Sequence, residues 1–318
     1  MDSLIELRVC AIHHVALNVK AFELKHPNER PLPPFTAGSH IDVYLGNGLS
    51  RSYSLLNSPE ETNRYVIAVH RSPTSAGGSS YMHEEILSGD FLKCTSPKNH
   101  FPLEEIAASF CFIAGGIGVT PMLSMIHRAI ALGKPWELHY CTRTRQHAAY
   151  LNELQSLTAS SHGRLHTYFD QEPEGNRLDL AALASGISDQ THLYCCGPTG
   201  MLEAFESVTH RIRDRAHVEY FGAKEAAARD GGYTVELAKS GLTLTIPQGK
   251  SILDIVLDAG IPIRTSCREG ICGSCETAIL HGEADHRDAL LSDQERKDNK
   301  SMMICCSGSK GPLLVLDL

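Results

Sequence analysis

The sequence lacks an excess of positive charge, because 37 acidic residues outnumber 29 basic ones and give a net charge of −8. A chain without a basic stripe is not expected to bind nucleic acid. It also lacks any apolar run of the roughly 18 residues that a membrane-spanning helix needs, so no membrane association is expected. The first residues, MDSLIELRVCAIHH, show no basic segment followed by an apolar core. We therefore expect no secretory signal and a cytoplasmic location.

Cysteine, in contrast, is frequent, and the chain contains eleven of them, an odd number. In a long chain without a secretory signal, this count argues against a disulfide framework and favours metal binding or catalysis. Three of the cysteines, Cys267, Cys272 and Cys275, lie within nine positions and are interleaved with Gly270 and Gly273. This clustering indicates one shared site.

The spacing C-x4-C-x2-C, followed after 29 residues by Cys305, is that of a plant-type 2Fe-2S site. Glycines allow positive φ angles, so the loop can wrap around a cluster and direct N–H groups at the sulfurs. A structural zinc site usually has two short ligand pairs, and the adjacent Cys305 and Cys306 would be a poor second pair. Plant-type ferredoxins resemble the segment ICCS in having a small apolar residue after the ligand, which favours Cys305 over Cys306.

The chain divides into segments of different character, which predicts a multidomain protein. Residues 1–104 contain short strand-like runs typical of an antiparallel β-barrel or sandwich. Residues 105–224 alternate strands with helices, which predicts an α/β domain with a parallel sheet and helices on both faces. Residues 225–232, EAAARDGG, are interpreted as a linker. Residues 233–318 combine a hairpin, an amphipathic helix, the cysteine loop and a closing strand, as in an α+β unit.

The expected elements follow from short apolar runs and from helical spacing. Expected barrel strands are 6–17, 39–45, 51–57, 64–71 and 91–97. Expected strands of the parallel sheet are 109–115, 136–142, 165–170, 191–197 and 217–222, with a helix at 121–133. In the last unit we expect a hairpin over 233–247 with its turn at Ser240-Gly241, a helix at 251–260 and a strand at 312–318.

A glycine-rich turn in FIAGGIGVTPMLSM places Gly115, Gly116 and Gly118 between a strand and a helix. Such a turn lets a pyrophosphate approach the backbone, and the helix N-terminus favours its charge. The full dinucleotide fingerprint is missing, since no third glycine and no acidic residue follow at the expected places. The motif is not a P-loop either. Alone, it could also be a tight strand–helix turn.

A second motif, LYCCGPTGML, places Cys196, Gly197 and Pro198 at the end of a later strand. Ligands of parallel sheets bind at the carboxyl ends of the strands, so both motifs occupy places where a nucleotide would bind.

The segment RSYSLLN carries Arg51, Tyr53 and Ser54 on a predicted strand. Arg51 and Tyr53 share one face, and the set could be an ordinary half-buried strand. An arginine for phosphate, an aromatic ring for stacking and a hydroxyl for a ring nitrogen are also what a flavin requires. The segment GGSSYMHEEIL opens a helix with small polar residues, a second possible phosphate site.

Arg-x-Tyr-Ser, the Gly-Gly-Ile-Gly-x-Thr-Pro turn, Cys-Gly-Pro and the C-terminal C-x4-C-x2-C unit occur in that order. The chain thereby resembles the phthalate dioxygenase reductase family, which includes vanillate demethylase reductase subunits, over nearly its whole length. The resemblance implies an FMN-binding barrel, an NAD-binding domain and a C-terminal plant-type ferredoxin domain of the β-grasp type. It also implies electron delivery to a separate Rieske-type terminal oxygenase that acts on an aromatic or similar small substrate.

The resemblance also implies roles for individual residues. FMN would contact a set of barrel residues: Arg51, Tyr53, Ser54, His70, Arg71, Gly78, Ser79 and Ser80. The nicotinamide nucleotide would contact Gly115, Gly116, Gly118, Thr120, Asp170, Cys196, Gly197 and Pro198. Phe221 matches an aromatic residue that stacks near the flavin ring in relatives, although core packing is the alternative. The reacting centre would comprise Ser54, Cys196 and Phe221, and the cluster ligands would be Cys267, Cys272, Cys275 and Cys305.

The expected reaction passes a hydride from NADH to FMN and then single electrons through the cluster to the partner. NADH is expected over NADPH, since Asp170 could bind a ribose hydroxyl and repel a 2′-phosphate; Arg143 and Arg145 are the counter-argument. His83 and the other histidines are interpreted as structural or surface residues, because no metal-ligand pair stands out.

Three other functions compete with this prediction. A reductase that serves another acceptor, such as a cytochrome P450, is the alternative. An electron-transfer module without NADH chemistry would lack the two nucleotide motifs. A self-contained Rieske oxygenase would need both a Cys-x-His and a Cys-x-x-His pair, and no Cys-x-His pair occurs. The ferredoxin unit has 12 acidic and 9 basic residues, 12 − 9 = 3 net negative, which favours transient docking to a partner with basic residues. The protein itself is expected to be a monomer.

Overall fold

The computed structural model describes residues 4–73 and 77–318. The predicted barrel residues 1–3 and 74–76 lie outside the described residues. The chain divides into two compact units, Met1–Glu219 and Tyr220–Leu318, which are described separately.

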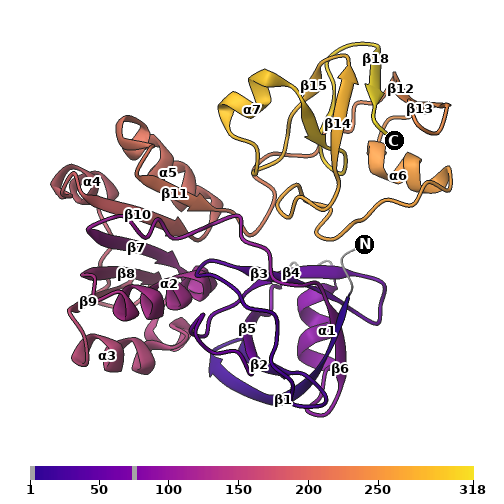
Figure 1. The fold of residues 1–318 in the computed structure, drawn as a ribbon. Coiled ribbons are helices and arrows are strands. Elements are labelled where there is room, and N and C mark those ends of the chain that lie inside the picture. The colour runs from indigo at the N-terminus through magenta and orange to yellow at the C-terminus, as the bar shows by residue number, and fades with distance from the viewer. Residues whose placement is uncertain (1–3, 74–76) are drawn as a thin grey trace. The chain divides into compact units, whose positions relative to one another are not determined.

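The N-terminal part of the first unit is an antiparallel sheet of six strands that curls into a half-barrel (Figure 1). The strands are β1 (Ile5–Ala16), β2 (Val19–Lys25), β3 (His40–Tyr44), β4 (Ser50–Ser54), β5 (Tyr65–His70) and β6 (Phe91–Cys94). They lie in the order β4-β3-β6-β1-β2-β5, and helix α1 (Gly78–Glu84) follows β5. The five expected barrel strands are present.

Strand β2 was not expected from the sequence. It pairs with β1 through a turn at Asn18, a non-glycine residue with φ 60. Because Asn is one of the few side chains that tolerate this left-handed conformation, the chain reverses without glycine or proline. The turn therefore has no conspicuous sequence signal.

The second part of the first unit is a five-stranded parallel sheet in the order β11-β10-β7-β8-β9. Its strands are β7 (Ser109–Gly115), β8 (Trp136–Thr142), β9 (Gly163–Phe169), β10 (Thr191–Cys196) and β11 (Ala216–Glu219). Its helices are α2 (Val119–Ala131), α3 (Leu151–Ala159), α4 (Leu180–Gly186) and α5 (Thr199–Thr209), with short 3-10 turns η1 (Gly116–Gly118), η2 (Arg145–His147) and η3 (His210–Ile212). Helices α2 and α3 lie on one side of the sheet and α4 and α5 on the other (Figure 1), as predicted.

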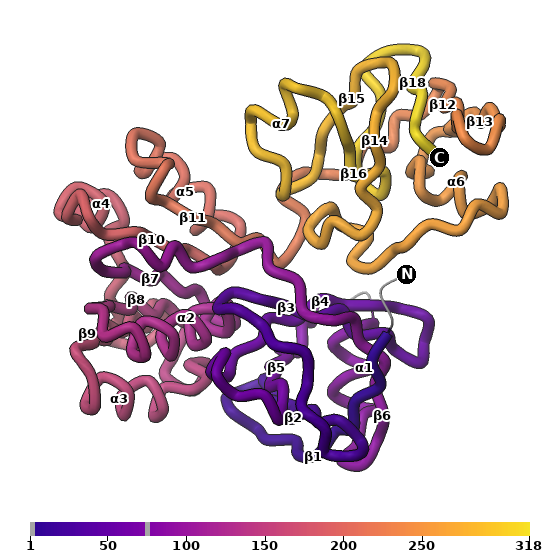
Figure 2. The backbone as a smooth tube through the Cα atoms, viewed as in Figure 1, coloured from indigo at the N-terminus to yellow at the C-terminus, as the bar shows by residue number. Residues whose placement is uncertain are grey.

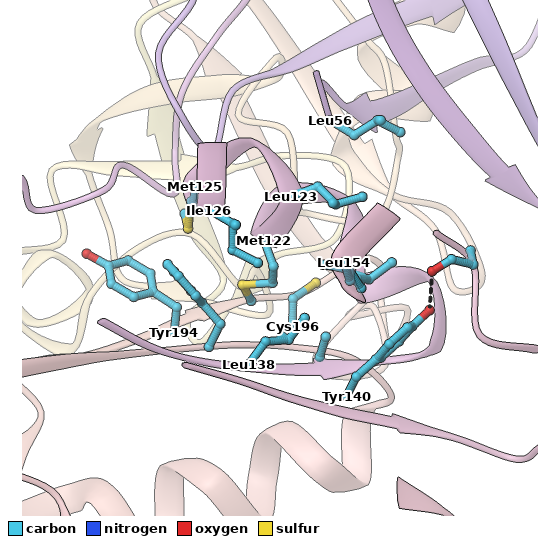
Figure 3. Close-up of a cluster of buried hydrophobic side chains, with 14 of the residues drawn as sticks. Leu56, Met122, Leu123, Met125, Ile126, Leu138, Tyr140, Leu154, Tyr194 and Cys196 are labelled. Carbon is cyan, nitrogen blue, oxygen red and sulfur yellow. Dashed lines mark hydrogen bonds between the residues drawn. The ribbon is translucent and has the colours of Figure 1, made fainter. Parts of the chain in front are cut away.

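One hydrophobic core continues from the parallel sheet into the barrel. It contains Phe112 of β7 and the barrel residues Ala21 and Val66. It also contains Met122 of α2 and Leu56 of the barrel, both labelled in Figure 3. Because an apolar core shared by two domains resists their separation, the barrel and the parallel sheet are held as one unit.

The second unit contains a five-stranded sheet in the order β13-β12-β18-β14-β16 (Figure 2). Its strands are β12 (Tyr233–Leu237), β13 (Leu242–Ile246), β14 (Glu276–His281), β16 (Ser301–Met303) and β18 (Leu313–Leu316), with a small sheet of β15 (Ala284–Asp285) and β17 (Gly308–Ser309). Helices α6 (Ile252–Asp258) and α7 (Asp293–Asp298) each begin with a capping box, from Ser251 and Ser292. The predicted hairpin, helix and closing strand are present.

Residues 225–232 contain no helix or strand and pack on the second unit. The N–H of Ala228 donates to the carbonyl of Cys306 at 2.7 Å, and the N–H of Gly249 donates to the carbonyl of Arg229 at 2.8 Å. The Arg229 guanidinium also contacts the Asp254 carboxylate at 3.1 Å. This segment is therefore attached to the cluster-side unit rather than extended between units.

Candidate cofactor sites

The barrel brings Arg51 to the start of helix α1. A Cβ added at Gly78 would lie 2.8 Å from Nε of Arg51, so the absence of a side chain at Gly78 leaves room for the arginine in this position. The N–H of Ser72 donates to Oγ of Ser79 at 3.2 Å, which joins the residues after β5 to helix α1. Ser80 is the next residue of α1. An arginine beside small residues at a helix start is suited to a terminal phosphate.

The hydroxyl of Tyr53 is buried and has no hydrogen-bond partner among the described residues. Burial raises the pKa of Tyr53, so the phenol keeps its proton. Buried polar groups are nearly always paired, and an unpaired one at a candidate site indicates a place for a ligand. Ser54, the last residue of β4, is also buried. The barrel residues thus fit a flavin with one phosphate.

His70 and Arg71 have different surroundings. Burial lowers the pKa of His70, and the charge of Arg143 from the parallel-sheet domain lowers it further. His70 is therefore close to the boundary between the two domains of the first unit. The guanidinium of Arg71 pairs with the carboxylate of Glu84, which links β5 to α1.

The two nucleotide motifs come together at the carboxyl ends of β7 and β10. A Cβ at Gly118 would lie 2.2 Å from the carbonyl oxygen of Cys196, and one at Gly115 would lie 2.5 Å from Cδ of Pro198. A Cβ at Gly197 would lie 3.0 Å from Cα of Gly115. The glycines are thus required for the close packing of the two turns, independently of any ligand.

Gly116 has φ +56, and a Cβ there would meet no atom within 4 Å, so the turn is open at this residue. Thr120 is buried, and its hydroxyl donates to the carbonyl of Ile117 at 3.0 Å. The open backbone at Gly116 leaves room for a pyrophosphate, while Thr120 holds the shape of the turn.

The thiol of Cys196 lies in the core of the domain, close to Met122 and Leu138 (Figure 3). Burial is the main cause that raises its pKa, so the thiol is protonated and unreactive at neutral pH. The backbone of Cys196, rather than its sulfur, lies at the sheet edge where the two nucleotide motifs meet.

Glu219 is a candidate that the sequence analysis missed. It pairs with Cys196 across β10 and β11, and its Oε2 has no hydrogen-bond partner among the described residues. Burial raises the pKa of Glu219 to about 8. At neutral pH this carboxyl holds a proton and offers an O–H donor at the strand edge. The sequence signal that could have identified Glu219 is an acidic residue at the end of the last parallel strand.

Asp170 follows β9 and donates its N–H to the carbonyl of Thr142 at 3.2 Å. Its carboxylate lies 3.9 Å from the exposed Arg177 guanidinium. Arg145 is placed over the ring of Phe169, 5.1 Å from its centroid. The loops after β8 and β9 therefore place the Asp170 carboxylate and the Arg145 guanidinium at the same edge of the sheet.

The four proposed cluster ligands, Cys267, Cys272, Cys275 and Cys305, are all buried. Arg268, Gly270 and Gly273 have positive φ angles of 57, 71 and 71, so the loop curls around its own cysteines. A Cβ at Gly270 would lie 2.5 Å from Sγ of Cys306, so no larger residue fits there.

Backbone N–H groups of this loop point at the sulfurs. Those of Glu269 and Ile271 donate to Sγ of Cys267 at 3.3 and 3.5 Å, and that of Cys267 donates to Sγ of Cys272 at 3.4 Å. The Cys275 thiol beside it is the main cause that lowers the pKa of Cys305 to about 4. Thiolates ligate iron, and the N–H groups directed at the sulfurs would stabilise their negative charge, so these residues fit a 2Fe-2S cluster.

The thiol of Cys306 has hydrogen-bond partners outside the four proposed ligands. It donates to the carbonyl of Met303 at 3.6 Å and contacts Oγ of Ser307 at 3.8 Å.

Phe221, in the second unit, is 38% exposed and so is free to contact a ligand. Within the described ranges 4–73 and 77–318, no helix is long and apolar enough to cross a membrane.

Comparison with known proteins agrees with this arrangement. The oxidoreductase NAD-binding domain family matches residues 112–207, and the 2Fe-2S iron-sulfur cluster binding domain family matches residues 235–309. A phenoxybenzoate dioxygenase subunit beta from Ectopseudomonas oleovorans is 49% identical over 99% of this chain and 97% of its own. The phthalate dioxygenase reductase of Burkholderia cepacia is 39% identical over 100% and 98%. The solved structure of a phthalate dioxygenase reductase, titled as a modular structure for electron transfer from pyridine nucleotides to [2Fe-2S], matches with a TM-score of 0.76 and 38% identity, covering 100% of this chain and 98% of that one.

Proposed function

Because the chain belongs to the phthalate dioxygenase reductase family, we propose that it carries electrons from NADH to a separate Rieske-type oxygenase. It is an oxidoreductase, the reductase component of an oxygenase system, and its cofactors are FMN, NADH and a 2Fe-2S cluster. The partner is proposed to act on an aromatic or similar small substrate, since phenoxybenzoate and phthalate in the names of two relatives are aromatic carboxylates. The observation that carries the proposal is the buried four-cysteine loop in the same chain as the paired nucleotide motifs.

The boundaries proposed for the domains are 1–104 for the FMN barrel, 105–224 for the NAD-binding domain, 225–232 for the connection and 233–318 for the ferredoxin domain. The described contacts of residues 225–232 with Cys306 and Asp254 support treating the connection as part of the ferredoxin side in any experiment.

When bound, FMN accepts a hydride from NADH and releases electrons singly, and the cluster carries single electrons. The chain's own residues bind and orient these groups. Arg51 with Gly78, Ser79 and Ser80 is proposed to hold the phosphate. Tyr53 and Ser54 are proposed to donate to the ring system. Phe221 is proposed to stack near the flavin.

At the nucleotide site, the open turn at Gly116 is proposed to admit the pyrophosphate. The packed turns of Gly115, Gly118, Gly197 and Pro198 keep the strand ends rigid. Glu219 holds a proton on its carboxyl at neutral pH and is proposed to offer an O–H donor at this strand edge. The backbone of Cys196 forms part of this strand edge.

Replacing Arg51 with glutamine is expected to weaken FMN binding tenfold to a hundredfold. A hydrogen bond to a charged group contributes about 1.5–3 kcal/mol, and each 1.4 kcal/mol is a factor of ten. The dissociation constant is measured by flavin fluorescence during titration of the deflavinated protein. Arg8→Gln, which changes an exposed arginine of β1, is the control and should bind FMN normally. Unchanged affinity in Arg51→Gln would remove this residue from the site.

NADH is expected to give a higher kcat/KM than NADPH, and Asp170→Asn should reduce the ratio about tenfold, or about 1.4 kcal/mol. The reason is that the substitution removes the negative charge that would repel a 2′-phosphate. Glu174→Gln, in the same exposed loop, is the matched control. A wild-type preference for NADPH would contradict the role proposed for Asp170.

The proposed function is tested by mixing the holoprotein with NADH and a purified Rieske-type oxygenase and measuring oxygenated product. Docking is proposed to use the ferredoxin domain, and a monomeric reductase is expected in solution. Turnover with a cytochrome P450 but with no Rieske-type oxygenase would favour the alternative acceptor.

A further inference from the structure

A group of metal-ligand side chains lies on the parallel sheet, away from both nucleotide motifs. Cys111 of β7 pairs with Glu137 of β8, and His139 of β8 pairs with His166 of β9. In a parallel sheet, paired residues and residues two apart on one strand share a face. All four side chains therefore lie on one face, the one opposite the core residues Phe112 and Leu138.

Three of these side chains converge. One ligand atom each from Cys111, Glu137 and His139 lie within 4.8 Å of one another. Ligands of a tetrahedral zinc ion lie about 3.5 Å apart, so small side-chain rotations would close the set around one ion. A thiolate, a carboxylate and an imidazole are a ligand combination that suits Zn²⁺ and similar divalent transition metals.

The orientation of His139 gives independent support. Its side chain is only 8% exposed, and its Nδ1 lies 3.0 Å from the hydroxyl of Tyr168. Its Nε2 has no hydrogen-bond partner among the described residues, and the nearest carboxylate oxygen, Oε1 of Glu137, is 3.7 Å away. Metal-bound histidines typically hydrogen-bond an oxygen through the second ring nitrogen, and Tyr168 is placed for that role.

The surroundings also allow an ion to enter. Every residue of α4, on this side of the sheet, is at least partly exposed. The ring of His166 stacks on that of His139 with centroids 4.7 Å apart, and the His166 side chain is 45% exposed. Its Nε2 is 3.9 Å from Oε2 of Glu137, so His166 stands between the three converging groups and solvent.

We propose that Cys111, Glu137 and His139 form a binding site for a divalent transition metal ion, with Zn²⁺ as the best match. The charges balance, because one thiolate and one carboxylate neutralise a dication, as a buried site requires. Burial raises the pKa of the Cys111 thiol, so binding at neutral pH releases about one proton from this sulfur as the metal–sulfur bond forms. The site is separate from the cluster and does not depend on the proposed function.

The test is a titration of the holoprotein, loaded with FMN and the cluster, with Zn²⁺ in competition with a chromogenic chelator. We expect one zinc per chain with a dissociation constant below about 1 µM. Cys111→Ser and Glu137→Gln should each weaken binding by roughly a hundredfold or more, and Tyr168→Phe by about tenfold to a hundredfold. Cys195→Ser, another buried thiol exchanged for a hydroxyl, is the matched control and should bind zinc like the wild type.

Iron content, flavin absorbance and melting temperature are measured on the same samples, so that a variant that fails to fold is recognised. Because Glu137→Gln changes a partly exposed side chain, it provides a second variant if Cys111→Ser is unstable. The proposal is overturned if the wild type binds no zinc in this range, if zinc is gained only as iron is lost, or if folded Cys111→Ser and Glu137→Gln retain it.

Discussion

Cys275→Ala is expected to remove essentially all iron from the holoprotein while the flavin is still reduced by NADH. The substitution removes a ligand sulfur, and alanine offers no replacement atom. The residue belongs to the second unit, whereas Arg51, Tyr53 and the nucleotide turns belong to the first. Iron per chain and the visible spectrum measure the cluster, and anaerobic bleaching of the flavin by NADH measures the first unit.

The neighbouring thiol provides the control for this experiment. Cys306→Ala should retain a full complement of iron, because Cys306 is not among the four proposed ligands and its thiol donates to the carbonyl of Met303. A reversal, with iron retained in Cys275→Ala and lost in Cys306→Ala, would show that the ligand assignment is wrong. Loss of flavin reduction in Cys275→Ala would show that the first unit depends on the cluster for its structure.

Much of the parallel sheet could be predicted from the sequence, for a physical reason. Strand β7, for example, is buried on both faces and appears as the continuous apolar run SFCFIAG. The helix was expected at 121–133, and α2 begins two residues earlier, at Val119, because the glycine turn itself is a 3-10 helix that leads into it. Its end was predicted from Gly133, which has φ 65.

The candidate sites divide in the same way. The cysteine loop could be predicted because its ligands are close in the chain and its glycines are required by geometry. The convergence of side chains from neighbouring strands could not be predicted, because it depends on the register in which the strands pair. Glu219 meets Cys196, and Cys111 meets Glu137, only through the pairings of β10 with β11 and of β7 with β8. No local pattern carries that information.

The segment 225–232 illustrates a further limit. Its composition indicates the absence of regular structure, which the structure confirms, but composition carries no information about hydrogen bonds to distant residues. Ala228 bonds to Cys306, which directly follows the proposed ligand Cys305, and Arg229 contacts Asp254 in the capping box of α6. An irregular segment can thus stabilise the cluster domain.

A fragment of residues 225–318 is therefore expected to be more stable than a fragment of residues 233–318, by about 2–3 kcal/mol. Two backbone hydrogen bonds contribute about 1 kcal/mol each, and the partly exposed ion pair of Arg229 with Asp254 contributes up to about 1 kcal/mol. Both fragments contain the four proposed ligands, so both should bind iron when freshly reconstituted. Urea unfolding, followed by the visible absorbance of the cluster, measures the difference in the free energy of unfolding.

The complementary fragment, residues 1–226, is expected to fold with FMN and to reduce ferricyanide with NADH, because its shared core lies wholly within the first unit. It should reduce cytochrome c poorly, since single-electron delivery is assigned to the cluster. Ala228→Pro in the 225–318 fragment, which removes the N–H that bonds Cys306, should lose about half of the added stability. Equal stability of the two C-terminal fragments would show that residues 225–232 add no net free energy in solution. A 225–318 fragment that folds but binds no iron would contradict the cluster itself, because every proposed ligand is present in it.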